Sequence, residues 1–203
     1  MMKFSYAIAC GLAFLFCHAS TTQADFLVNG FGLNNPEQTI GFDELGLPFD
    51  TQITNQYDGV SFSSGVFQSP QDLDGLGIFN FDENWIGNFP STFEATNPYS
   101  VFFDDLVDSA AFAFVSNDGI TEFTALLNGN VVDSNSTFTQ VSDPNNFFGF
   151  EGIVFNEIQI FVDPTSTEGG GGIDNLQFNT VPEPSTFVVC AILAATALVR
   201  RRK

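Results

Sequence analysis

The chain has 203 residues, a length that allows one ordinary domain with targeting segments at its ends. Its formal net charge is -19, and no Lys, Arg or His lies between residues 19 and 199. Such a polyanion repels DNA and RNA, which excludes nucleic acid as a partner, and it attracts divalent cations or a basic partner. Because residues 25–180 also lack cysteine, they cannot build a Ser-His-Asp site, a Cys-His site or a lysine Schiff base.

Residues 1–24 have the three-part pattern of a secretory signal peptide. Lys3 provides a cationic start, and residues 6–17 are apolar. We expect cleavage after Ala24, with cleavage after Ala19 as the alternative. The apolar stretch is shorter than the roughly 20 residues that span a bilayer, so the sequence predicts export rather than a permanent N-terminal anchor.

Between residues 25 and 180, short alternating or aromatic runs are separated by Gly, Asn, Asp, Pro and Ser, and no run keeps a helical period. The predicted strands span residues 39–42, 52–57, 60–63, 77–81, 99–103, 111–115, 122–127, 130–133, 147–150, 158–162 and 173–178. The chain contains 26 Phe residues, whose rings can fill the gap between two packed sheets. We therefore expect an all-β domain at residues 25–180, a single β-sandwich of jelly-roll type, with a closed barrel as the alternative.

The clearest turn is Asn128-Gly129, which lies between two apolar runs. Both residues tolerate positive φ, as a two-residue type I′ hairpin requires, so the flanking strands should be antiparallel neighbours. Phe112 and Phe114 alternate with alanines, which predicts that one face of that strand enters the core while the other is open. Residues 165–172 (TSTEGGGG) are expected to be a mobile loop, since no Lys and no helix follow as in a phosphate-binding loop.

Carboxylates form the first candidate site, a calcium site. Asp43 and Glu44 follow an early predicted strand, and Asp174 opens the last one. Calcium takes about six to eight oxygen ligands, and if those strands are neighbours, Asp43 or Glu44 can share an ion with Asp174. The alternative is that Asp174 and Asn175 cap a loop. No other cofactor is indicated.

The second candidate site is a sugar-binding surface around Trp85, Asn84, Tyr57 and Tyr99. An exposed aromatic face stacks on a pyranose ring while neighbouring amides orient its hydroxyls. We expect both tyrosines to be partly buried. For Trp85, whose neighbours in the sequence are polar, exposure and core packing are equal alternatives.

An enzyme is the competing class of function. A pair of carboxylates can hydrolyse glycosidic bonds, and carboxylates are abundant in this chain. The doublets Asp82-Glu83 and Asp104-Asp105 place adjacent side chains on opposite faces if they lie in strands, so neither doublet is by itself a catalytic pair. We expect a non-enzymatic protein, with a glycoside-active enzyme that uses carboxylates alone as the alternative.

The segment 181–203 has three parts in a fixed order. Pro182, Glu183 and Pro184 precede an uncharged run at residues 187–199. The chain then ends in Arg200, Arg201, Arg202 and Lys203. At 1.5 Å per residue the uncharged run makes a helix of about 20 Å, shorter than a hydrocarbon core of about 30 Å.

The basic residues that follow this run would stay on the cytoplasmic side of the membrane, with the acidic body outside. We therefore expect transient single-pass insertion after export. A permanently anchored surface protein is the alternative.

These three elements closely resemble the PEP-CTERM sorting signal of bacterial exported proteins. The resemblance implies that an exosortase, a membrane cysteine protease-transpeptidase, recognises Pro182-Glu183-Pro184 and removes the tail. It also implies delivery to the cell surface or to an exopolysaccharide matrix.

Parts of the body resemble β-sandwich domains of lectin-like or carbohydrate-binding type. These parts are residues 40–45, 53–57, 60–62 and 172–178. The expected protein is an exported, non-enzymatic component of the envelope or matrix that is structural or associated with polysaccharide.

Overall fold

The computed structural model describes residues 25–69, 73, 75, 77–90, 95–167 and 169–182. The expected signal peptide, and the expected sorting segment beyond Pro182, lie outside these residues. The described chain is built from β-strands together with one helical turn, α1 (Pro164–Thr167). The strands are β1 (Asp25–Asn29), β2 (Gln38–Ile40), β3 (Val60–Phe62), β4 (Phe67–Ser69), β5 (Trp85–Gly87), β6 (Tyr99–Ser116), β7 (Gly119–Leu127), β8 (Asn130–Thr139), β9 (Phe147–Val162) and β10 (Gly171–Thr180). The expected all-β class is confirmed.

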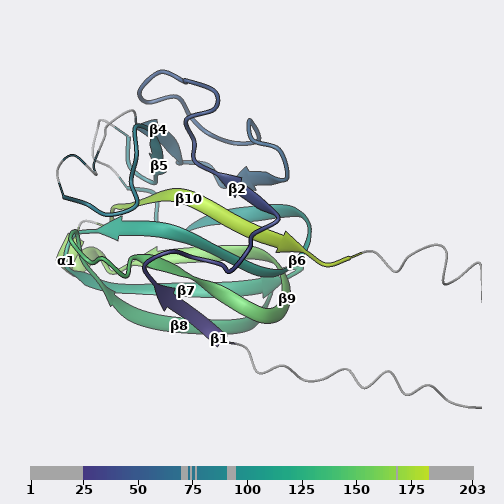
Figure 1. Ribbon diagram of the computed structural model, residues 1–203. Coiled ribbons are helices and arrows are strands. Elements are labelled where there is room, and N and C mark those ends of the chain that lie inside the picture. Colours follow the sequence, from purple (N-terminus) through teal and green to yellow (C-terminus); the bar gives the residue numbers. More distant parts are fainter. Residues whose placement is uncertain are drawn as a thin grey trace, which may run out of the picture.

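Two long strands, β6 and β9, each run through both layers of a folded sheet. One layer, the β10 layer, contains β10 with β1, β2 and β5, residues 107–116 of β6 and residues 147–151 of β9. The other, the β7 layer, contains β3, β7 and β8, residues 99–103 of β6 and residues 157–162 of β9. Figure 1 shows β10 with β2, β4 and β5 at one side of the molecule and β7 and β8 at the other.

The strand pairings follow an open path from β4 through β5, β10, β6, β9 and β7 to β8 among the described residues. The sheet is thus folded into a sandwich and not closed into a barrel. The pairing register of β6 shifts between Phe102 and Ser109, where the strand passes from one layer to the other. Register shifts of this kind bend a strand and increase its twist.

Phenylalanine rings fill the space between the two layers, as expected. Phe123 of β7 stacks on Phe148 of β9 with ring centroids 5.1 Å apart and an interplanar angle of 11°. Phe114 of β6 meets Phe123 edge-on at 5.3 Å. All three rings are buried, so each contributes both apolar burial and aromatic contact to the stability of the sandwich.

The expectation that one face of residues 111–115 is open is wrong. Phe112 and Phe114 enter the core between the layers, but Ala111 and Ala113 are also buried, in a second apolar cluster on the outer side of the β10 layer. The segments that cover this outer side include Leu33, Phe81 and Trp85. Alanine suits this position because its small side chain lets the covering segments approach the sheet.

The hairpin at Asn128-Gly129 is confirmed. Leu127 and Asn130 pair directly across the turn, and Asn128 and Gly129 have φ values of 52° and 78°. These positive values match a type I′ turn.

Other strand predictions need correction. Residues 77–81 are not a strand, and residues 52–57 contribute only an isolated bridge between Gln52 and Phe67. The glycine run is not simply a loop, because Gly171 and Gly172 begin β10. The residue after β10, Val181, donates its N–H to the carbonyl of Leu106 at 2.8 Å.

Candidate functional site

A bulge in β10 sets the geometry of the outer face of the β10 layer. Asp174 pairs with Ala113 and Gln177 pairs with Ala111, so Asn175 and Leu176 together lie opposite one residue of β6. Asn175 has a φ of 48°, a conformation that Asn adopts more easily than most residues. Bulges re-aim side chains and occur often beside functional sites.

Asp174, the residue immediately before the bulge, is 0% exposed. Its Oδ2 accepts the N–H of Asp82 at 2.9 Å, and its Oδ1 accepts the N–H of Asn175 at 2.6 Å. The pKa of Asp174 is raised to about 8, mainly by burial. The charges of Asp43 and Asp82 also raise it, and the two backbone hydrogen bonds act in the opposite direction. The buried carboxyl therefore keeps its proton at neutral pH.

The expected calcium residues are only partly brought together. Asp43 is near enough to act electrostatically on Asp174. However, Asp43 Oδ1 accepts the Asn84 amide at 2.8 Å, and Glu44 Oε1 accepts the Gly41 N–H at 3.0 Å.

Among the residues that the structure describes, no group of three or more His, Cys, Asp and Glu side chains could hold a metal ion. Calcium needs about six to eight free oxygen ligands, whereas both oxygens of Asp174 already accept backbone hydrogen bonds. These residues, as arranged, do not fit a calcium ion. Their contacts match the alternative, in which Asp174 and Asn175 fix a neighbouring loop.

The rings of the expected sugar-binding surface are buried. Tyr57 and Tyr99 lie in the core between the layers, beyond the partial burial that the sequence predicted, and Trp85 is 6% exposed. Tyr57 donates its hydroxyl to the carbonyl of Phe42 at 3.0 Å. Asn84 is partly exposed, and its side-chain amide donates a hydrogen bond to Asp43. These four residues therefore do not form one exposed stacking surface.

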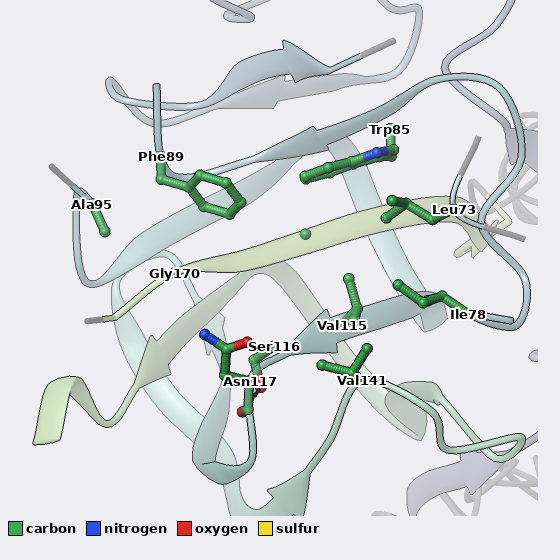
Figure 2. A pocket seen from close by; sticks show the side chains of 11 residues that line it. Leu73, Ile78, Trp85, Phe89, Ala95, Val115, Ser116, Asn117, Val141 and Gly170 are labelled. Atoms are coloured by element: carbon green, nitrogen blue, oxygen red, sulfur yellow. Dashed lines mark hydrogen bonds between the residues drawn. The ribbon is translucent and has the colours of Figure 1, made fainter. Parts of the chain in front are cut away.

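Trp85 does line a pocket of about 340 Å³ on the outer side of the β10 layer. Figure 2 shows Trp85 and Phe89 on one side of this apolar pocket, across from Val115 and Val141. A Cβ atom on Gly172 would lie 2.8 Å from the Trp85 ring. The glycine therefore lets the indole lie directly against β10.

The walls of the apolar pocket offer few hydrogen-bonding groups. The Ser116 hydroxyl, at one side, contacts the hydroxyl of Thr139 at 2.7 Å. A sugar carries a hydroxyl on most of its carbons, and recognition requires several well-placed polar groups. The chemistry of this pocket suits a small apolar ligand better than a glycan.

A second hollow, which we call the amide groove, lies beside the bulge and has a volume of about 490 Å³. It is lined by Gly30, Phe31, Phe79, Asn80, Asp82, Phe147, Asn175 and Gln177. Two of its rings are open to solvent, since Phe31 is 61% exposed and Phe79 is 44% exposed. The groove thus combines exposed aromatic faces with amides and a carboxylate, the mixture that binds sugars.

The turn that carries Phe31 is held by an amide from the sheet. Gln177 Oε1 accepts the N–H of Leu33 at 2.7 Å, and its Nε2 donates to the carbonyl of Phe31 at 3.4 Å. Within the turn itself, Asn29 Oδ1 accepts the N–H of Phe31 at 2.9 Å. These bonds fix the backbone beneath the exposed ring.

The turn that carries Phe79 is also held by side-chain amides, one from the loop before β9 and one from β10. Asn146 donates its amide to the carbonyl of Phe79 at 2.6 Å, and Asn175 donates to the carbonyl of Asn80 at 3.0 Å. Asn80, with a φ of 60°, donates to Asn146 Oδ1 at 2.6 Å. Both aromatic turns are thereby preorganised, which lowers the entropic cost of binding.

Four residues of the groove were not among the site residues predicted from the sequence: Phe31, Phe79, Asn80 and Gln177. A weak signal is present, because Phe31 and Phe79 lie in NGFGLNN and GIFNFDEN, where glycine and asparagine surround an aromatic residue. Such stretches form turns, and a large ring on a turn has little neighbouring structure to cover it. The carboxylate of the groove, Asp82, was considered only as half of an acidic doublet.

Comparison with known proteins gives limited information. No family model matches the chain, and no curated protein matches it. Among solved structures, the chain is similar to CsCBM6-3 from Clostridium stercorarium, which was solved in complex with cellobiose. The TM-score is 0.35 and the sequence identity is 14%. The match covers 66% of this chain and 95% of the other.

The chain is also similar to the Agl-KA catalytic domain, with a TM-score of 0.35 and 13% identity. That match covers 74% of this chain and 30% of the other. TM-scores this low do not indicate what the chain binds. The features that bear on its function are those of the amide groove itself.

Proposed function

We propose that this protein is an exported, non-enzymatic component of the cell surface or extracellular matrix whose β-sandwich binds polysaccharide through the amide groove. The observation that carries the proposal is the pair of exposed rings, Phe31 and Phe79, on turns fixed by the side-chain amides of Gln177 in β10 and Asn146 in the loop before β9. Rigid aromatic faces next to hydrogen-bonding side chains match the alternating apolar and polar surfaces of a pyranose.

The carboxylates near the groove support binding rather than hydrolysis. Glycosidases use two carboxyl groups on opposite sides of the scissile bond. Asp82 is exposed at the groove, but Asp174 is fully buried and both its oxygens accept backbone N–H groups. Although the raised pKa of Asp174 would suit a general acid, its carboxyl has no access to a bound substrate.

The ends of the folded domain are compatible with export and sorting. β1 begins at Asp25, directly after the predicted signal cleavage site, and β10 ends at Thr180, before the Pro-Glu-Pro tripeptide. Removal of residues 1–24 and of the tail after Pro182 would leave in place every strand of the part of the chain that the structure describes. We propose that an exosortase removes this tail, and that membrane insertion is transient.

Carbohydrate binding can be tested with the purified full-length chain and a set of neutral hexasaccharides of glucose, mannose, galactose and N-acetylglucosamine. At least one should bind in titration calorimetry, and a double variant, Phe31→Ala with Phe79→Ala, should bind it at least about tenfold more weakly. Phe138→Ala is the matched control, because Phe138 is 54% exposed but lies on β8 in the other layer.

If the control weakens binding as much as the double variant, the groove is not the site, and if none of the hexasaccharides binds, the groove does not bind neutral glycans. Two further measurements test the rest of the proposal. The purified protein should release no reducing sugar from the polysaccharide it binds. Mass spectrometry should find protein that lacks Arg200 to Lys203, whereas an intact tail in all material would indicate permanent anchoring.

A further inference from the structure

The hydrogen-bonding atoms that the amide groove leaves open are mainly acceptors. The amide nitrogen of Asn80 donates to Asn146 Oδ1 and to the carbonyl of Gly30, and that of Asn175 donates to the carbonyl of Asn80. Within the described part of the chain, no hydrogen bond reaches the Oδ1 atoms of Asn80 and Asn175 or the carboxylate of Asp82. A ligand rich in donors therefore fits the groove better than one rich in acceptors.

The negative charge around the amide groove also favours a ligand that is rich in donors. Among the described residues that line the groove, Asp82 alone carries a charged side chain, and no Lys, Arg or His lies between residues 19 and 199 to offset it. A uronic-acid or sulfated glycan would bring further negative charge to this surface without a cation to receive it. A cationic ligand would meet both a favourable potential and a carboxylate partner.

An ammonium group meets both conditions, because it carries a positive charge and three donors but no acceptor. The exposed faces of Phe31 and Phe79 also attract cations, while their apolar area remains available to a sugar ring. We propose that the amide groove selects glycans with free amino groups, such as polymers of glucosamine, over neutral and acidic glycans. This inference deepens the proposed function and depends on it.

The test uses β-1,4-linked tetramers of glucosamine, of N-acetylglucosamine and of a uronic acid, each titrated into the full-length chain. The glucosamine tetramer should bind about fivefold more tightly than its acetylated form, the ratio expected for one exposed charge pair. The uronate tetramer should bind more weakly than both. Raising the salt concentration from about 0.05 M to about 0.5 M should reduce the preference for the amine, because salt screens exposed charges.

Two variants of equal net charge separate a local effect from general attraction to a polyanion. Asp82→Asn should reduce the ratio between the amine and acetylated tetramers towards one. Asp105→Asn removes the same charge from an exposed position at the bend of β6 and should leave the ratio unchanged. If both variants reduce the ratio equally, the preference does not arise in the groove and the inference is refuted.

The remaining outcomes distinguish this inference from the proposed function. If the acetylated tetramer binds as tightly as the glucosamine tetramer, the inference fails while carbohydrate binding stands. If no tetramer and no neutral hexasaccharide binds, both fail together. If a tetralysine peptide binds as tightly as the glucosamine tetramer and with the same dependence on Asp82, the groove recognises amines without recognising sugars, and the inference is wrong.

Discussion

The buried carboxyl of Asp174 should make the stability of this protein fall as the pH rises from about 4 to about 8. Burial raises its pKa from 3.8 to about 8 in the folded chain. Between these values the folded state keeps the proton and the unfolded state loses it, so unfolding releases a proton and becomes easier at higher pH. This contribution to stability is fully present below the unfolded pKa, and it is lost as the pH passes through the folded value.

The size of the effect follows from proton linkage. One proton released on unfolding changes the free energy of unfolding by about 1.4 kcal/mol per pH unit. Between pH 5 and pH 7 the loss is then about 2 to 3 kcal/mol, a large part of the stability of an ordinary domain. Other carboxylates repel one another more strongly as the pH rises, so the slope has to be compared between variants.

Asp174→Asn removes the titration while keeping the size of the side chain. Its amide nitrogen would face either the N–H of Asp82 or that of Asn175, so the variant should be less stable than the parent at pH 5 by about 1 to 3 kcal/mol. The parent loses the stability contributed by the Asp174 proton as the pH rises, whereas the variant has no such contribution to lose. The difference in the free energy of unfolding between parent and variant should therefore shrink towards pH 8.

The measurement is urea unfolding of the full-length chain, with chelator present, followed by the fluorescence of Trp85, the single tryptophan of the chain. Asp105→Asn serves as the control, because it removes an exposed carboxylate and should keep the slope of the parent. Parallel stability curves for Asp174→Asn and the parent between pH 5 and pH 7 would refute this reasoning.

Three other predictions concern metal binding and packing. Millimolar calcium at pH 8 should leave the melting temperature unchanged, because both Asp174 oxygens already accept N–H groups; a rise of several degrees would show that Asp43 and Asp174 rearrange around an ion. Gly149→Ala should destabilise by about 1 to 3 kcal/mol or prevent folding, since the new Cβ would overlap the backbone of β6. Gly41→Ala, whose Cβ would have only one neighbour, at 3.8 Å, should have little effect in the same thermal unfolding assay. Phe123→Ala should cost about 3 to 5 kcal/mol in urea unfolding, because the ring is fully buried against other aromatic rings; a loss below about 1 kcal/mol would contradict the packing described for the core.

Local signals in the sequence were enough to predict the elements that local interactions determine. The Asn128-Gly129 turn and the strands beside it depend on backbone preferences of two residues and on neighbouring apolar runs. Local signals did not predict that residues 99–116 form the single strand β6, because Asp104 and Asp105 interrupt the apolar pattern where the strand bends. Likewise β5 has only three residues, and it is a strand because β4 and β10 pair with it.

The distinction between local and long-range interactions also applies to the candidate site. The sequence singled out Asp43 and Asp174, because both flank predicted strands, but it placed them together only on the condition that those strands are neighbours. It did not indicate the amide groove, because Phe31 and Gln177 are 146 residues apart in the sequence and come into contact only in the folded domain. Sequence patterns report which residues favour turns, but they do not report which turns come together.

The position of β10 has a mechanical consequence. This strand carries the bulge beneath the groove, and among the described residues it is also the last strand before the proposed sorting segment. It is hydrogen-bonded to β6 on one side and to β2 and β5 on the other. Sheet hydrogen bonds lie across the strand direction, so tension on a tethered C-terminus would pull along β10 and load many of these bonds together in shear. A protein attached to a surface through this end would carry the load on the strand that holds its ligand.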